Sequence, residues 1–313
     1  MEMHWHWLIV IYLFLGGLGA GAYLTSFAAE KGWLGSNSRL KKAGYYIAAP
    51  IVAFGTVLLV FDLGQGLYKP WLLVRLLLNF GSVMTWGVYI LSAFIIVGLI
   101  KAYLVFKNKQ APEVLAWAGA GLAVATAAYT GLLLAVVEAV PFWNSYIMPI
   151  LFVVSALSTG LSVTTLVAYF MKKEGSTSVK ENQVHLSLVA TELIIVVIFF
   201  GLMSFGANGP VGAQSAVSVL SGSYAVVFWG YFIGLGLLFP LVVFVLEHLH
   251  LKQSVQKVST QPSLAEKESA ATVQSGHQSY LVLISDLYVV IGGFALRALI
   301  IFAAFPIWDG TIL

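Results

Sequence analysis

Eight apolar segments, each long enough to cross a lipid bilayer, divide this chain of 313 residues. A membrane-spanning helix needs about 20 mostly apolar residues, and an open sheet would leave backbone donors unpaired in lipid. We therefore expect helices at 7–29, 44–64, 81–106, 112–138, 146–171, 185–206, 223–250 and 280–305. Charged residues make up only 9% of the chain, against about 25% in soluble domains. The predicted fold class is an all-α polytopic membrane protein.

The basic residues are confined to alternate connections between these segments. The first, third, fifth and seventh connections hold 13 of the 16 lysines and arginines. Basic loops stay in the cytoplasm during insertion, so both termini are expected on the external side. The first segment is expected to be an uncleaved membrane helix, because residues 1–7 contain no Lys or Arg. A net charge of +3 placed in this way needs no nucleic-acid partner.

A division near 172–184 predicts two four-helix bundles, residues 1–171 and residues 172–313. The second includes a polar cytoplasmic connection at about 251–279, rich in Ser, Gln, Lys and Glu.

Five ionisable residues lie within or at the ends of the apolar segments, where a charge costs about 2.5–3.5 kcal/mol. The predicted topology puts Asp62 and Glu138 near the external face, and Glu192 and Asp286 nearer the cytoplasm. Arg297 lies towards the outer third of the last segment. One interpretation is structural, with Arg297 paired to Asp62 or Glu138. The other is a line of protonatable groups, formed by Glu192, Asp286 and Arg297, that leads from the cytoplasm to a site near the outer face.

Small residues and aromatic residues share one face of the first segment. Tyr12, Gly16, Gly19 and Tyr23 recur at helical spacing, which predicts a slot for a flat ring with phenol hydroxyls as hydrogen-bond partners. The same face would also serve as a close contact between two helices.

The fourth segment supplies a second set of candidates. Tyr129 and Thr130 lie within it, Glu138 lies at its end, and Asn144 follows in the run Pro141–Ser145. Tyr129 and Glu138 are nine positions apart and would face opposite ways on a regular helix. Both can line one pocket only if the helix ends before Glu138.

The sequence contains no cysteine, which excludes disulfides and any thiolate-bound iron–sulfur cluster. The histidines do not form a haem pair inside the spans, since His185, His248 and His250 are expected at the cytoplasmic edge. We therefore expect no haem and no metal site in this protein.

Six motifs in order resemble the NrfD-type, polysulfide-reductase-like membrane subunits. They are the runs Tyr12–Tyr23, Phe61–Gly64, Asn79–Tyr89, Tyr129–Leu134, Pro141–Ser145 and Gly292–Arg297. The sequence departs from the family pattern after Gly64, where Gln65 and Gly66 stand in place of Arg-Pro.

The resemblance implies a cofactor-free membrane anchor in the cytoplasmic membrane of a bacterium or archaeon. Such a subunit exchanges electrons and protons between menaquinone or ubiquinone and a ferredoxin-like iron–sulfur subunit at the outer face. A molybdopterin enzyme or a multihaem cytochrome lies beyond that subunit and acts on the soluble substrate. Carried onto this sequence, Tyr12 and Tyr129 would bind the quinone, and Asp62 or Glu138 would exchange the proton.

Two alternatives stay open at this point. An ion-coupled secondary transporter would use Glu192, Asp286 and Arg297 as its ion site, but it predicts inverted halves, which four spans per half do not give. A structural anchor without a quinone site would keep the fold and leave Asp62 and Glu138 as packing groups.

Overall fold

The computed structural model describes residues 7–35, 40–62, 78–171, 178–260 and 280–307, without the side chains of Asp62 and of 254–260. These residues are helical and contain eight spans long and apolar enough to cross a membrane. The elements are α1 (Trp7–Glu30), α2 (Leu40–Asp62), α5 (Val83–Phe106), α6 (Glu113–Ala135), α7 (Ile147–Met171), α8 (Val179–Ser204), α9 (Gly209–Leu220), η1 (Val227–Leu238), α10 (Phe239–Thr260) and α12 (Tyr280–Phe302). The predicted all-α membrane fold is confirmed.

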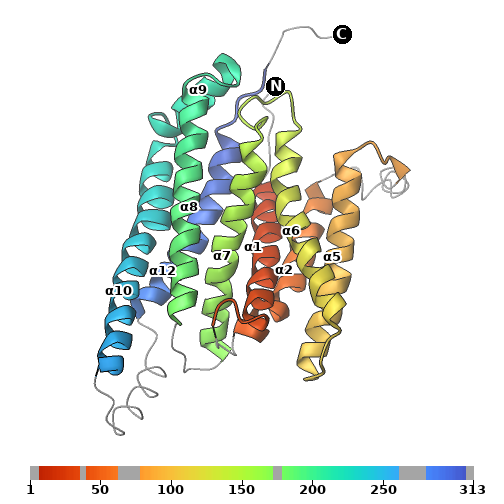
Figure 1. The fold of residues 1–313 in the computed structure, drawn as a ribbon. Coiled ribbons are helices and arrows are strands. Elements are labelled where there is room, and N and C mark those ends of the chain that lie inside the picture. Colours follow the sequence, from red (N-terminus) through yellow and green to blue (C-terminus); the bar gives the residue numbers. More distant parts are fainter. Residues whose placement is uncertain (1–6, 36–39, 63–77, 172–177, 261–279, 308–313) are drawn as a thin grey trace.

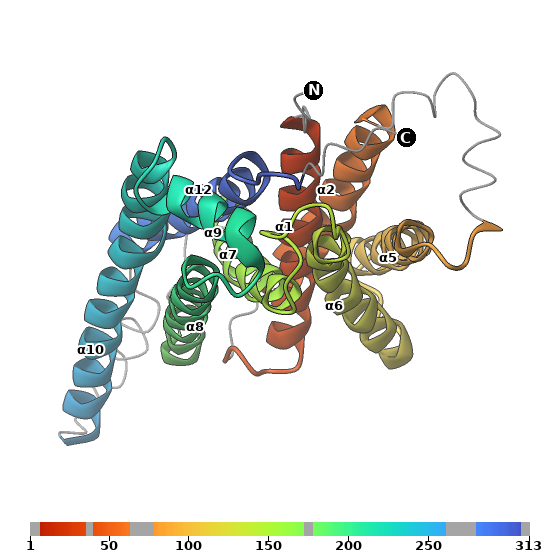
Figure 2. The same cartoon turned by 90° about the horizontal axis from the view of Figure 1, so that it is seen from above.

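Helix α7 lies at the centre of the molecule (Figures 1 and 2). It packs against α1, α2 and α6 on one side and against α8 and α12 on the other. Five spans precede residue 172 and three follow it, so a grouping into fours places α7 with α8, η1–α10 and α12. The division into two bundles stays a proposal, with α1 and α7 forming the contact between the groups.

Glycine allows the backbones of α1 and α7 to touch. A Cβ atom added at Gly21 would lie 1.9 Å from the carbonyl oxygen of Ala156, and one at Gly160 would lie 2.4 Å from the Cα of Gly21. No side chain can be accommodated at such a crossing. The small-residue runs noted in the sequence therefore hold the two groups of helices together.

Two helix boundaries differ from the sequence-based expectation. Helix α8 begins at Val179, six residues earlier than predicted, because Ser178 and Glu181 form a capping box. Helix α10 continues to Thr260, so the first ten residues of the predicted polar connection 251–279 are helical. Its remaining residues, 261–279, lie outside the described part of the sequence.

One helix was not predicted, and one predicted span has an unexpected geometry. Helix α9 is a short helix beyond the end of α8, and it buries Gly212, Ser215, Ala216 and Val219 along one face. The seventh span opens as a π-helix, η1, whose Gly236 contacts Gly292 of α12. A Cβ atom at either glycine would lie 2.6 Å from the Cα of the other.

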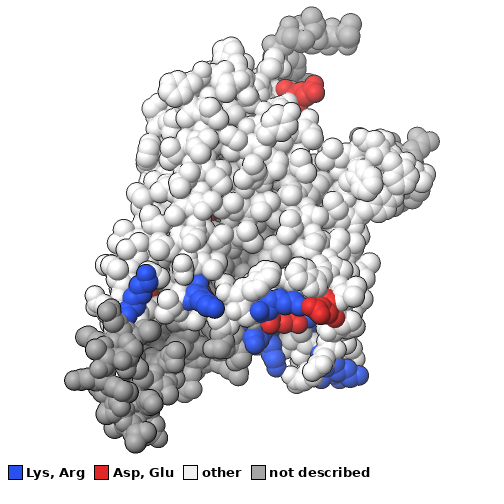
Figure 3. All heavy atoms as spheres, viewed as in Figure 1, with Lys and Arg blue, Asp and Glu red and all other residues white. Residues whose placement is uncertain are grey.

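The two ends of the molecule differ in charge. Lysines of the described residues gather at the end where α1 finishes and α2 starts (Figure 3). The first turn of α1 and the last turn of α12 lie together at the opposite end (Figure 1). The lysine-rich end is called the basic end below. Its assignment to the cytoplasm, and that of both termini to the exterior, stays a prediction.

Candidate functional site

Two buried tyrosines meet between α1, α5 and α6. Tyr12 of α1 is fully buried, and its hydroxyl has no hydrogen-bond partner in the described part of the sequence. Tyr129 of α6 is 4% exposed and close enough to Tyr12 for the two phenols to interact electrostatically. Burying a hydroxyl without a hydrogen-bond partner costs about 1–3 kcal/mol of stability. The Tyr12 hydroxyl is therefore free to form a hydrogen bond with a polar ligand atom.

A glycine on α5 provides the space for the Tyr129 phenol. A Cβ atom at Gly87 would lie 1.8 Å from Cζ and 2.1 Å from the hydroxyl oxygen of Tyr129. Any larger residue at this position must displace the ring. The position of the Tyr129 hydroxyl is therefore set by α5 as well as by α6.

The other predicted ring-binding residues serve helix packing in this structure. A Cβ atom at Gly16 would meet Thr130 at 3.2 Å, and one at Gly19 would lie 2.7 Å from the carbonyl oxygen of Ala48 on α2. The Thr130 hydroxyl donates to the carbonyl oxygen of Ala127 within its own helix, at 2.7 Å. These residues form the frame around Tyr12 and Tyr129, and their contact with a ring stays a prediction.

Helix α6 ends before Glu138, as a shared pocket with Tyr129 would require, and that pocket stays a prediction. The helix ends at Ala135, so the backbone has left helical geometry before the exposed Glu138. Asp62 is the last residue of α2, and its side chain lies outside the described residues. Asn144 is exposed, and its carbonyl oxygen accepts a hydrogen bond from Asn208.

Trp143, in the connection after α6, is fully buried. Its indole N–H donates to the carbonyl oxygen of Ile300 on α12, at 2.6 Å. Nearby, the N–H of Ile307 donates to the carbonyl oxygen of Ala139, at 2.8 Å. The 136–146 connection is thereby fixed against α12.

A face of buried hydroxyls runs along α7, formed at helical spacing by Ser155, Ser158, Ser162 and Thr165. Glu192 of α8 is 2% exposed and lies close to Ser155, Ser158 and Arg297. Because α8 starts at Val179, Glu192 lies about 20 Å from its beginning, at the middle of the helix.

Arg297 of α12 lies at the contact between α1, α7 and α12. It is fully buried, and its Nη1 donates to the Ser155 hydroxyl at 2.5 Å and to the carbonyl oxygen of Gly293 at 2.8 Å. Its Nε and Nη2 have no partner among the described residues. The proposed pairing with Glu138 is wrong, because the acidic neighbour of Arg297 is Glu192 and Glu138 is exposed.

His185 joins Asp286 near the basic end and was missed as a site residue. The sequence places it at the membrane interface, yet it is only 2% exposed. Its Nδ1 lies 3.5 Å from Oδ1 of Asp286, and its Nε2 lies 3.5 Å from the Thr165 hydroxyl. Asp286 is fully buried close to Ser162, and its carboxylate oxygens have no hydrogen-bond partner among the described residues. A useful signal would have been the Ser178–Glu181 capping box, which places His185 inside a helix.

The structure therefore places five of the predicted residues in two separate regions. Tyr12 and Tyr129 meet on one side of α1, while Glu192, Asp286 and Arg297 share the hydroxyl face of α7 on the other. Among the described residues, no three His, Asp or Glu side chains are grouped so as to hold a metal ion.

The sequence matches one protein family along most of its length. Residues 1–265 match the family model described as polysulphide reductase, NrfD. The polysulfide reductase C subunit of Wolinella succinogenes is 30% identical over 328 residues, which cover 96% of this sequence and 93% of that protein. The NrfD homolog of Haemophilus influenzae is 27% identical, with 96% of this sequence and 94% of that protein covered. Protein NrfD of Escherichia coli is 29% identical, with 76% and 83% covered. The protein is thus a multi-pass membrane protein that belongs to the polysulphide reductase NrfD family.

Proposed function

We propose that this protein is the membrane-anchor subunit of a respiratory oxidoreductase complex. In this role it exchanges electrons and protons between the quinone pool and a ferredoxin-like iron–sulfur subunit docked at the outer face. A molybdopterin enzyme or multihaem cytochrome beyond that subunit would act on the soluble substrate, and this subunit alone would not. Family membership and the likeness to a polysulfide reductase subunit support the proposal.

The single observation that carries the quinone site is the unpartnered hydroxyl of Tyr12. It is a buried donor beside Tyr129, and the neighbouring hydroxyl of Thr130 is already satisfied within its own helix. A bound quinone supplies carbonyl oxygens that accept hydrogen bonds, and its reduction takes up two electrons and two protons. Tyr12 and Tyr129 would hold these oxygens, with menaquinone or ubiquinone as an exchangeable substrate.

Protons reach or leave this site through two sets of residues in the proposal. Glu138, and Asp62 at the end of α2, would exchange protons with the external side. Glu192, Asp286 and Arg297 would form an inner path, supported by the α7 hydroxyls that lie between them. Electrons must pass to a partner, since the sequence has no cysteine to bind a cluster.

The test is reconstitution of the purified complex with Tyr12→Phe, Tyr129→Phe or Glu138→Gln. We expect quinone-linked turnover to fall about tenfold, the effect of losing one or two hydrogen bonds, while activity with a soluble dye is kept. Tyr146→Phe is the matched control, because Tyr146 is 97% exposed. Unchanged quinone kinetics in all three variants would leave a structural anchor without a quinone site.

The inner path has its own test. Asp286→Asn removes the carboxylate and keeps its shape, so it should slow quinone-linked turnover without changing dye reduction. Glu247→Gln is the control, since Glu247 is a half-buried carboxylate of α10, a helix that supplies no residue to the proposed path. Equal turnover in both variants would remove Asp286 from the mechanism.

A further inference from the structure

A cavity of about 530 Å³ opens at the basic end, between the end of α1, the start of α2, the end of α5 and the start of α6. None of the residues proposed for the quinone site or the proton path lines it. Its wall contains five lysines and two glutamates, a formal net charge of +3. The charged and amide residues are Glu30, Lys31, Lys41, Lys42, Lys101, Asn108, Lys109, Gln110 and Glu113.

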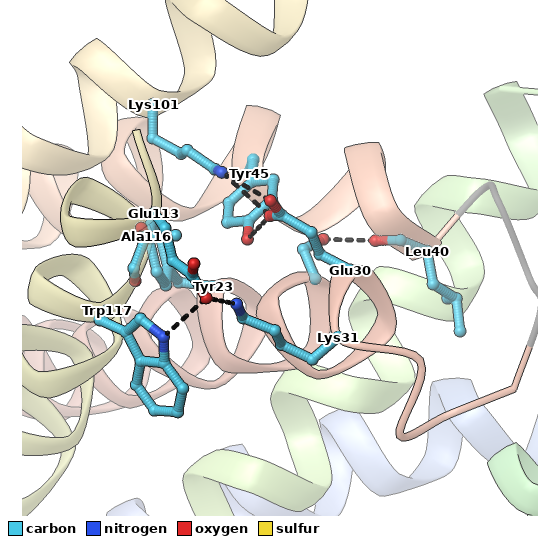
Figure 4. A network of polar contacts seen from close by, with 10 residues as sticks. Tyr23, Glu30, Lys31, Leu40, Tyr45, Lys101, Glu113, Ala116 and Trp117 are labelled. Atoms are coloured by element: carbon cyan, nitrogen blue, oxygen red, sulfur yellow. Dashed lines mark hydrogen bonds and ion pairs between the residues drawn. The ribbon is translucent and has the colours of Figure 1, made fainter. Parts of the chain in front are cut away.

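Both carboxylates of the wall are already engaged by neighbouring groups (Figure 4). Glu30 forms an ion pair with Lys101, whose Nζ lies 2.9 Å from Oε2. The same carboxylate accepts a hydrogen bond from the hydroxyl of Tyr45. Lys101 is 2% exposed and also lies over the Tyr45 ring. Glu113 pairs with Lys31. Because both carboxylates are paired with lysines, the other lysines of the wall give the cavity its excess positive charge.

Three lysines of the wall, Lys41, Lys42 and Lys109, are not paired with these carboxylates and can bind an anion. Lys42 donates to the side-chain oxygen of Asn108 at 2.8 Å. Lys41 and Lys109 have no ion-pair partner within the residues that the structure describes. Three ammonium groups thus line a space whose two carboxylates are already paired with other lysines.

The surroundings of the cavity favour a lipid over a soluble ion. It lies where four membrane helices begin or end, which is the depth of the lipid headgroups. Exposed aromatic residues typical of the membrane interface lie at the same helix ends, namely Trp33, Tyr103 and Trp117. Helix α5 contributes Lys101 and Val105 to the wall of the cavity. The same helix exposes Leu99, Tyr103 and Phe106 on the surface of the protein.

We propose that this cavity binds the phosphate-bearing headgroup of an anionic phospholipid. Lysine ammonium groups recognise phosphate oxygens, and basic pockets between membrane helices are suited to such headgroups. Lys41, Lys42 and Lys109 contact the phosphate, and the amides of Asn108 and Gln110 lie beside the glycerol part. The acyl chains extend along the exposed apolar surface of α5.

The experiment is native mass spectrometry of the purified full-length protein in detergent, titrated with phosphatidylglycerol or with phosphatidylcholine. The test variant is Lys41→Gln with Lys109→Gln. The matched control, Lys107→Gln with Lys252→Gln, removes the same charge from exposed lysines of the same end that do not line the cavity. Parallel titrations add inorganic phosphate or glycerol phosphate as competitors, and melting temperature checks that each variant is folded.

We expect phosphatidylglycerol to bind more tightly than phosphatidylcholine, and the Lys41/Lys109 variant to lose about thirtyfold in affinity. The control should keep wild-type affinity. Equal loss in both variants, or no preference for the anionic lipid, would overturn the proposal. Full displacement of the lipid by millimolar inorganic phosphate would instead assign the site to a free anion. If the double variant does not fold, Lys109→Gln alone against Lys107→Gln gives the same comparison with a smaller loss.

Discussion

Two buried polar regions lie on opposite sides of α1, and they differ in charge. Around the Tyr12–Tyr129 pair, between α1, α5 and α6, the buried polar side chains include the two phenols and the hydroxyl of Thr130. Between α7, α8 and α12 they are Glu192, Asp286 and Arg297, interleaved with hydroxyls. Unpartnered polar atoms occur in both regions among the described residues. The first has the Tyr12 hydroxyl, and the second has both carboxylate oxygens of Asp286, the hydroxyls of Ser158 and Ser162, and Nε and Nη2 of Arg297.

This difference separates two ways of using a polar group inside a membrane. A single unpartnered hydroxyl is inexpensive to keep and becomes favourable when a ligand accepts from it. Buried charges cost more, so they are kept only where they pair with each other or carry ions or protons. We infer a ligand site in the first region and a proton route in the second.

The largest effect is expected from Arg297→Gln. The change leaves Glu192 buried without its positive neighbour and should lower the free energy of unfolding by about 3 kcal/mol or more. Thermal unfolding in detergent measures the loss. Adding Glu192→Gln should recover part of it, whereas a double variant as unstable as the sum of the single ones would show that the two side chains are independent.

The next effect tests how the two regions are joined. Gly21→Ala places a methyl group on the backbone of Ala156 and should cost roughly 1–3 kcal/mol in stability. Gly121→Ala in α6 is the control, because a Cβ atom there meets nothing within 4 Å. The control should melt at or slightly above the wild-type temperature, since Ala favours a helix. Equal melting temperatures for both variants would contradict the close α1–α7 crossing.

The third prediction tests whether quinone binding depends on the position of the Tyr129 phenol. Gly87→Ala leaves Tyr129 intact but pushes its phenol away, so the KM for quinone should rise roughly tenfold with dye reduction unchanged. The comparison variant is Gly201→Ala in α8, a site with open space around the new methyl group. Wild-type quinone kinetics in Gly87→Ala would mean that the position of Tyr129 does not matter.

The smallest effect is expected at the surface. Lys31→Gln removes the ion pair with Glu113, whose side chain is 71% exposed. Exposed pairs contribute little because water screens them, so the melting temperature should stay within the scatter of replicate wild-type samples. A clear drop would show that ion pairs at the basic end stabilise the fold as the buried charges do.

The spans could be predicted from the sequence because apolar length and charge placement are local properties. All eight were found, and α1, α5 and α7 agree with their expected bounds to within two residues. Helix α9 was missed because its buried face is made of small residues, Gly212, Ser215 and Ala216, that carry little hydrophobic signal. The span that contains η1 was predicted, but its π-helical geometry was not.

The candidate site was less predictable because it depends on contacts between distant helices. The sequence could name Tyr12 and Tyr129 but not the role of Gly87, which lies on a third helix. It expected His185 at the interface, because the polar residues before it resemble a loop, whereas Ser178 and Glu181 cap a helix there. The burial of Trp143 follows from its partner Ile300, 157 positions away.

The central claim, that a quinone head binds between Tyr12 and Tyr129, has a rival location in the second region. An apolar cavity of about 220 Å³ lies between α8 and η1, lined by Phe200, Phe228 and Trp229 among others. It has almost no polar surface with which to orient quinone carbonyls. It could accommodate only an apolar tail.

Photo-crosslinking of the reconstituted complex with an azido-quinone, followed by peptide mapping, distinguishes the two locations most directly. We predict labelled peptides from α1, α5 or α6 around Tyr12, Gly87 and Tyr129, with the label reduced in Tyr12→Phe and unchanged in Tyr146→Phe. Label confined to α8 and η1, or equal labelling in both variants, would contradict the account.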